Sequence, residues 1–72
     1  MSRPEKHSLT LRGHRTSVSL EPEFWAAFRD IAEAEGMGVN ALATRIDETR
    51  SGGTGLATAI RLHVLRHYRA AR

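Results

Sequence analysis

The residues with the clearest chemical potential lie between Arg15 and Leu20, where polar and apolar side chains alternate. Successive side chains of a strand point to opposite sides, so an extended segment here would have two unlike faces. The polar face would carry one positive charge and two hydroxyls, on Arg15, Ser17 and Ser19. The mostly apolar face would consist of Thr16, Val18 and Leu20. Guanidinium and hydroxyl groups in this arrangement are suited to hydrogen-bond a polar or anionic partner.

This strand has no evident partner within the chain. The alternation extends back to Leu9 and Leu11, but Gly13 and His14 interrupt it, as in a bulge or a bend. An unpaired strand leaves its backbone hydrogen-bonding groups unsatisfied and is unstable alone. We therefore expect the same strand of a second copy to complete a two-stranded antiparallel ribbon, which would display the polar face twice.

Other residues suggest catalytic or metal chemistry only weakly. His63 and His67 stand four residues apart, as metal ligands on a helix can, but the sequence offers no third ligand beside them and no glutamate directly after His63. A serine of the strand with His14 lacks an orienting carboxylate and a pocket. The Gly-rich stretch 50–55 lacks the lysine of a phosphate-binding P-loop. We expect no enzyme activity, no bound metal and no cofactor.

The length of 72 residues allows one small domain, whose core would be marginal without a disulfide, a metal or oligomerisation. The chain has no cysteine, which closes the disulfide route and favours oligomerisation. No apolar run reaches the roughly 18 residues of a membrane span, and no signal-peptide apolar region follows the start. We therefore expect a cytoplasmic protein that enters no membrane and associates with itself.

The net charge of +3 is unevenly distributed along the chain. Residues 1–20 carry four Lys/Arg and one Glu, and residues 51–72 carry four Arg and no acid. The intervening residues 21–50 carry three Arg and seven acids. Basic ends around an acidic centre fit a chain that meets a polyanion through its first and last thirds, although an ordinary solvated surface can show the same pattern.

Three helices are expected after the strand. Pro22 suits the first turn of a helix that would extend to about Glu35 and bury its aromatic residues on one face. Gly36 would end this helix in a left-handed conformation, and a second helix would begin near Val39 or Asn40. A third, basic helix would follow from about residue 55, with a buried stripe made by Leu56, Ile60, Val64 and Tyr68.

These elements predict a fold that is mainly α with one β-strand. They divide the chain into a flexible N-terminal arm at 1–8, a strand-helix-helix core at 9–50, a Gly-rich linker at 51–55 and a basic amphipathic helix at 56–72. The last helix would either pack on the core or recruit another dimer or protein. We favour packing, because its apolar stripe needs a cover.

The start of the second helix, at Gly38, Val39 and Asn40, would leave backbone N–H groups free at the positive end of the helix dipole. Such a start can bind an anion, or it can be an ordinary helix start with water on those groups. A phosphate becomes plausible there if the basic ribbon lies alongside.

The order strand, helix, helix resembles the ribbon-helix-helix superfamily of bacterial transcription regulators, which includes the methionine and Arc repressors. The similarity covers residues 14–50, with the strand RTSVSL, the helix start EPEFW, the turn EGMG and a second helix. More narrowly, the segments GHRTSVSLEPEFW, NALATRID and LATAIRLHVLRH resemble a family of short bacterial ribbon-helix-helix proteins that are presumed to bind DNA. This narrower resemblance covers about residues 9–69.

The resemblance implies an intertwined dimer in which two strands pair antiparallel and enter the DNA major groove. The residues that would contact bases are Arg15, Ser17 and Ser19. Phosphate contacts would come from residues near the ribbon and at the start of the second helix, namely Arg12, His14, Gly38, Val39 and Asn40. The dimer core would contain Val18, Leu20, Trp25, Phe28, Leu42 and Ile46.

The sequence therefore favours a homodimeric, sequence-specific DNA-binding protein that regulates transcription. Its partners would be double-stranded DNA and its own second copy, with higher-order assembly on DNA as an open option. The alternative is a dimeric adaptor or an antitoxin-like module whose C-terminal helix binds a protein partner.

Overall fold

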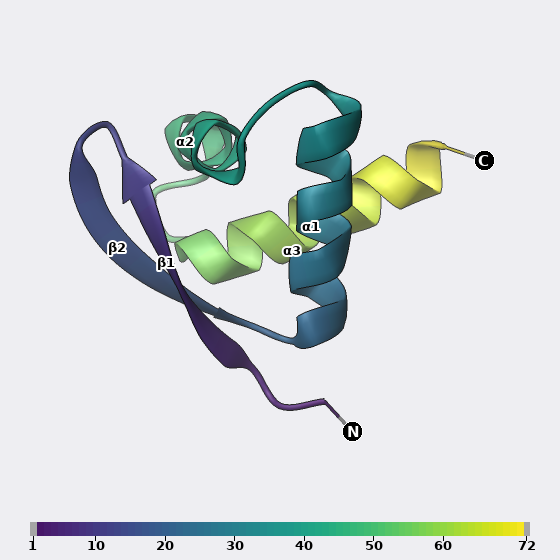
Figure 1. Ribbon diagram of the computed structural model, residues 1–72, viewed down its shortest axis with the longest axis horizontal. Coiled ribbons are helices and arrows are strands. Elements are labelled where there is room, and N and C mark those ends of the chain that lie inside the picture. Colours follow the sequence, from purple (N-terminus) through teal and green to yellow (C-terminus); the bar gives the residue numbers. More distant parts are fainter. Residues whose placement is uncertain (1, 72) are drawn as a thin grey trace.

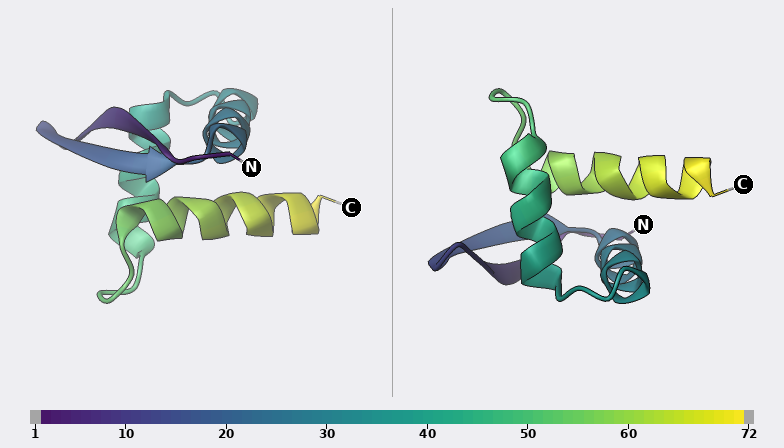
Figure 2. Two further views of the ribbon diagram at one scale, coloured as in Figure 1. Left: turned by 90° about the horizontal axis from the view of Figure 1, so that it is seen from below. Right: turned by 90° about the horizontal axis from the view of Figure 1, so that it is seen from above.

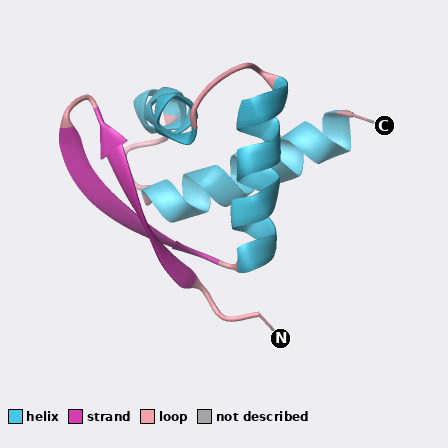
Figure 3. Ribbon diagram, viewed as in Figure 1, coloured by secondary structure: helices cyan, strands magenta, loops and turns pink. Residues whose placement is uncertain are grey.

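The computed structural model describes residues 2–71; Met1 and Arg72, the outermost residues of the expected arm and C-terminal helix, lie outside this range. Two strands are followed by three helices: β1 (Glu5–Leu11), β2 (His14–Leu20), α1 (Pro22–Ala34), α2 (Val39–Thr49) and α3 (Leu56–Ala70). The strands form an antiparallel hairpin that lies along one side of the three helices (Figures 1 and 3).

Both strands of the hairpin belong to one chain. The prediction of a single strand that pairs only with a second copy is therefore wrong. The register places Leu11 opposite His14 and Glu5 opposite Leu20. Arg12 and Gly13 connect the strands with φ values of 51° and 82°. Two successive left-handed residues make a type I′ turn, whose twist matches that of a hairpin. The interruption at Gly13 is therefore a turn between two strands and not a bulge within one.

Half of the N-terminal segment that was expected to be a flexible arm belongs to β1. Residues 5–8 are strand residues. Because their side chains are all polar, the sequence shows no apolar alternation that would predict a strand here. Of these four residues, only His7 is partly buried. Its ring stacks on the Trp25 indole of α1, with ring centroids 3.9 Å apart. An imidazole thus occupies a position in β1 that a sequence pattern would require to be apolar.

The inner face of the hairpin packs on the helices, which cover Leu9, Leu11, Val18 and Leu20. Five of the six residues expected in a dimer core, namely Val18, Leu20, Phe28, Leu42 and Ile46, are at most 5% exposed within the single chain. The sixth, Trp25, is partly buried and packs against the same cluster. These residues form the core of one copy and need no second copy to cover them. Thr16, expected on this face, is exposed near the turn.

The α1 helix ends in a Schellman motif. Gly36 has a φ of 68°, its N–H donates to the Glu33 carbonyl, and the Met37 N–H donates to the Ala32 carbonyl. The left-handed residue turns the chain sharply toward α2, and Met37 packs against the core. The expected helix end at Gly36 is confirmed.

The α3 helix packs against α1, α2 and β2, and it buries Ala59, Ile60 and Val64. Three large apolar residues of α3 are exposed: Leu62, Leu65 and Tyr68 are 36%, 49% and 48% exposed. Tyr68 was expected in the buried stripe, but it lies toward the helix end, beyond most of the core. Within residues 2–71, no helix combines the length and the apolar character that crossing a membrane requires.

Candidate nucleic-acid interface

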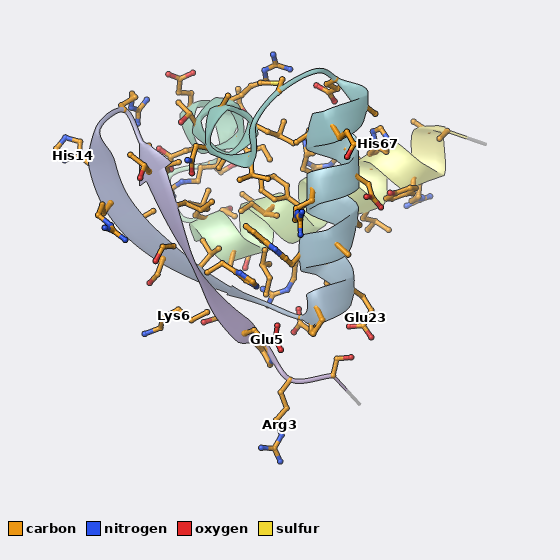
Figure 4. All side chains as sticks on the ribbon, viewed as in Figure 1. Arg3, Glu5, Lys6, His14, Glu23 and His67 are labelled. Atoms are coloured by element: carbon orange, nitrogen blue, oxygen red, sulfur yellow. The ribbon has the colours of Figure 1, made fainter. Side chains whose placement is uncertain are left out.

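The side of the hairpin that faces away from the helices is entirely polar. Because side chains alternate along each strand, six exposed residues share this outward face: Lys6, Ser8 and Thr10 of β1 with Arg15, Ser17 and Ser19 of β2. The register pairs Lys6 with Ser19, Ser8 with Ser17, and Thr10 with Arg15. Figure 4 shows Lys6 pointing away from the helices.

The sequence had identified half of this outward face. Arg15, Ser17 and Ser19 lie together as expected, but the residues across from them come from β1 of the same chain and not from a second copy of β2. Within residues 2–71, neither Lys6 nor Arg15 forms an ion pair. The outward face therefore presents two uncompensated cations and four hydroxyls.

Arg12 and His14, which were expected near DNA phosphates, lie at the tip of the hairpin. The Arg12 guanidinium donates to Asp47 Oδ2 and Glu48 Oε2, both at 3.0 Å. Its charge is thus already paired with the C-terminal part of α2. His14 is exposed and points outward from the tip (Figure 4).

Asp47 also binds Arg50, through its other carboxylate oxygen. Arg50 Nε donates to Asp47 Oδ1 at 2.7 Å. Hydrogen bonding to Arg50, with further contributions from Arg12, lowers the pKa of the Asp47 carboxyl below its ordinary value. The carboxylate therefore stays ionised and fixes the hairpin tip to α2.

The backbone of the hairpin offers free hydrogen-bonding groups along both outer edges. In a hairpin with a two-residue turn, Leu11 and His14 exchange both backbone hydrogen bonds, and bonded pairs then alternate along the strands. The backbone groups of Thr10, Arg15, Ser17 and Ser19 consequently point away from the neighbouring strand. Two observed contacts agree with this assignment, one on each edge.

On the β1 edge, the Thr10 N–H donates to Asn40 Oδ1 at 2.9 Å. Asn40 lies in the first turn of α2, so this contact holds the start of α2 beside the outward face. The Gly38 N-cap makes no side-chain capping hydrogen bond, and the first turn contains no acid. The backbone N–H groups expected to bind a phosphate thus lie next to the hairpin, and no acid within the first turn of α2 neutralises them.

On the β2 edge, Arg61 of α3 joins two groups. Its guanidinium donates to Glu21 Oε1 at 2.9 Å and to the Ser19 carbonyl at 3.1 Å. The hydrogen bond from Arg61 lowers the pKa of the Glu21 carboxyl below its ordinary value. The α3 helix therefore holds the end of β2, while Arg15 and Ser17 keep their outward backbone groups free of contacts outside the ribbon among the described residues.

Across residues 4–68, the chain matches the model of a family described as the ribbon-helix-helix domain. The chain belongs to this family. The match confirms the resemblance drawn from the sequence, which covered about residues 9–69, and extends it to the beginning of β1. No curated protein and no solved structure matches the chain. Ribbon-helix-helix domains are generally DNA-binding transcription regulators and typically form dimers.

The histidine pair on α3 brings no metal cluster together. Within residues 2–71, no group of three or more His, Cys, Asp or Glu side chains could hold a metal ion. Burial lowers the pKa of His63 below its ordinary value of 6.5 and outweighs the opposite effect of the Glu35 carboxylate, while Arg45 and Arg66 add to the lowering. In this ribbon-helix-helix chain His63 is therefore mainly neutral at pH 7.

Proposed function

We propose that this protein binds double-stranded DNA through the outward face of its hairpin and regulates transcription. The observation that carries the proposal is the Thr10–Asn40 hydrogen bond, because it places the uncapped start of α2 beside the polar face. Bases would be contacted by Arg15, Ser17 and Ser19, while the α2 start at Gly38, Val39 and Asn40 would bind a phosphate. Side chains would supply sequence recognition, and the backbone N–H groups would fix the position on the duplex.

We further propose that two copies pair through their β2 edges. A two-fold axis at Thr16 would place Arg15 of one copy opposite Ser17 of the other, and the outward backbone groups of both residues would then be satisfied. This arrangement leaves the Arg61–Ser19 contact intact. It also preserves the dimeric character typical of the family while keeping each hairpin within its own chain.

The width of such a sheet supports this assignment of roles. Strands lie about 4.8 Å apart, so two central β2 strands fit a major groove about 12 Å wide. The flanking β1 strands would then lie about 7 Å from the axis, near the phosphate walls. Lys6 would meet the backbone there, and Arg15 would remain over the bases.

Fluorescence anisotropy with a labelled duplex tests the proposal, in a salt series that begins at low ionic strength. We expect affinity to fall steeply with salt, because phosphate contacts release counterions. Arg15→Ala should weaken binding to a preferred sequence by about 1–3 kcal/mol and relax sequence preference. Arg69→Ala is the matched control, since Arg69 is exposed near the C-terminal end of α3, which lies on the side away from the hairpin (Figure 1). Absence of binding to any duplex at low salt would refute the proposal.

Molar mass by light scattering, with and without a short duplex, tests the dimer separately. Two copies per duplex with a dimer in free solution support pairing through β2. If the protein stays monomeric on DNA, pairing through β2 is excluded, and the hairpin of one copy would enter the groove by itself.

The exposed residues Leu62, Leu65 and Tyr68 favour a second candidate function, in which α3 binds a protein partner. This adaptor role would leave the outward face of the hairpin without a ligand. Capture of a partner that survives nuclease treatment and is lost in Leu65→Ser would support it. Persistence of capture in that variant would exclude α3 as the contact.

A further inference from the structure

Several features remain that DNA binding does not use: the Gly-rich loop between α2 and α3, the partly buried imidazole of His63, and Arg66. These features meet at one pocket, which lies between the end of α2, the loop and the first turns of α3. The lining residues are Ile46, Thr49, Arg50, Ser51, Thr54, Ala59, Leu62, His63 and Arg66, and we call this the α2–α3 pocket. No residue of the hairpin lines it.

The polar groups of the α2–α3 pocket suit an anion. It is lined by two arginines, three hydroxyls and one imidazole, and no carboxylate lines it. Within residues 2–71, Arg66 forms no ion pair, so its charge is uncompensated. The Nε2 atom of His63 is buried without a hydrogen-bond partner, which is costly for a polar atom unless a ligand or water satisfies it.

The structure also holds the other arginine in place. Arg50 donates through Nε to Asp47 and through a terminal nitrogen to the Thr54 carbonyl. The Thr54 N–H donates to the Ser51 carbonyl at 2.9 Å, which closes the loop into a turn. The Arg50 guanidinium and the backbone of the loop are therefore held in place before a ligand arrives, which lowers the entropy cost of binding. Because Asp47 balances much of the Arg50 charge, Arg66 supplies most of the net attraction.

The volume of the pocket limits the ligand. It measures about 120 Å³, which is several times the room that one water needs and well below the 300–1,000 Å³ of pockets for drug-sized ligands. A nucleotide or a dinucleotide would not fit. A small oxyanion would fill the space and accept hydrogen bonds from the Arg66 guanidinium, the Ser51 and Thr54 hydroxyls and an imidazole N–H. The Thr49 hydroxyl already donates to carbonyls of α2.

The position of the pocket separates it from the proposed DNA surface. Both views in Figure 2 show the loop between α2 and α3 projecting to the side away from the hairpin. A duplex on the outward face would therefore not reach it. From these observations the geometry points to a binding site for a small oxyanion, a phosphate or a carboxylate, in the α2–α3 pocket. This anion site does not depend on the proposed DNA binding.

Nuclear magnetic resonance titration of the full chain tests this inference. Inorganic phosphate is added at constant ionic strength, and sodium acetate is added in a parallel series to distinguish a phosphate site from a carboxylate site. We expect saturable shifts at Ser51, Thr54 and His63 with one of the two anions. Shifts that grow linearly with both anions, or none at these residues, would overturn the inference.

Matched variants separate a built site from general charge attraction. Arg66→Gln should weaken anion binding at least tenfold, whereas Arg69→Gln, which removes the same charge from an exposed position of α3 outside the pocket, should change it less than twofold. Equal losses in both variants would overturn the inference. Arg15→Ala should leave anion binding unchanged, and Arg66→Gln should leave duplex affinity within twofold. Displacement of the anion by duplex would show a shared surface and would also overturn it.

Discussion

The two faces of the hairpin differ in what they contact. The inner face is covered by the helices, and Leu9, Val18 and Leu20 are between 0% and 4% exposed. The outward face carries only polar residues, and its two cations have no carboxylate partner among residues 2–71. Because neighbouring positions of a strand serve opposite faces, stability and recognition are separable one residue at a time.

The largest effect is expected on the inner face. Leu20→Ala should lower the free energy of unfolding by about 2–5 kcal/mol, because it opens a cavity under the hairpin. Ser19→Ala, one position earlier on the outward face, should change it by only about 0.5 kcal/mol or less. Urea denaturation followed by circular dichroism measures both. Similar losses in the two variants would show that the faces are not independent.

The two strands of the outward face are expected to have different roles on DNA. Lys6→Ala should weaken binding to all duplexes about equally and reduce the salt slope by about one, as expected of a phosphate contact. Arg15→Ala should instead change the order of preferred sequences. Anisotropy with two unrelated duplexes at three salt concentrations distinguishes these outcomes. If Lys6→Ala alters sequence preference, β1 and not β2 lies over the bases.

Acid should loosen the attachment of β2 to α3. The Arg61 guanidinium lowers the pKa of Glu21 below its ordinary value of 4.5, so the ion pair contributes stability above that pH and loses it as the pH falls through the lowered value. Glu21→Gln should therefore flatten the decline in stability below pH 4.5. Thermal unfolding at several pH values measures this, with Glu33→Gln as the exposed control. An unchanged pH profile in Glu21→Gln would contradict the role of the contact.

The smallest effect is expected at the tip. Arg12→Gly removes two ion pairs with Asp47 and Glu48 but also relieves a left-handed conformation that glycine adopts freely. These changes oppose each other, so the free energy of unfolding should stay nearly constant. Duplex affinity should change less than twofold, since the charge of Arg12 is already paired. A large loss of affinity would mean that Arg12 leaves its carboxylates to contact DNA.

Much of the helical layer could be predicted from the sequence, because burial imposes a helical spacing on Phe28, Ile31 and Ala32 and glycine marks the end of α1. The first strand could not. Glu5, Lys6 and Ser8 are polar whichever face they occupy, and His7 is covered by an aromatic stack that no hydrophobic pattern reveals. The sequence therefore predicted one strand and required a second copy to pair with it.

The candidate DNA surface was predictable only in part. Alternation around Val18 placed Arg15, Ser17 and Ser19 on one face, but Lys6, Ser8 and Thr10 joined them through a register that depends on the turn. That turn contains arginine where asparagine or aspartate is usual, so the strongest hairpin signal was missing. The pairing of Arg12 with carboxylates 35 and 36 positions later, and the convergence of Arg50, His63 and Arg66, are tertiary and leave no local trace.

The stack of His7 on Trp25 places the only indole of the chain at the junction of β1 and α1. Its emission should consequently report whether the first strand is docked. A fusion or truncation at the N-terminus that lifts this strand would shift the fluorescence spectrum while the helical ellipticity stays nearly constant. The molecule thus contains its own optical probe for release of an edge strand.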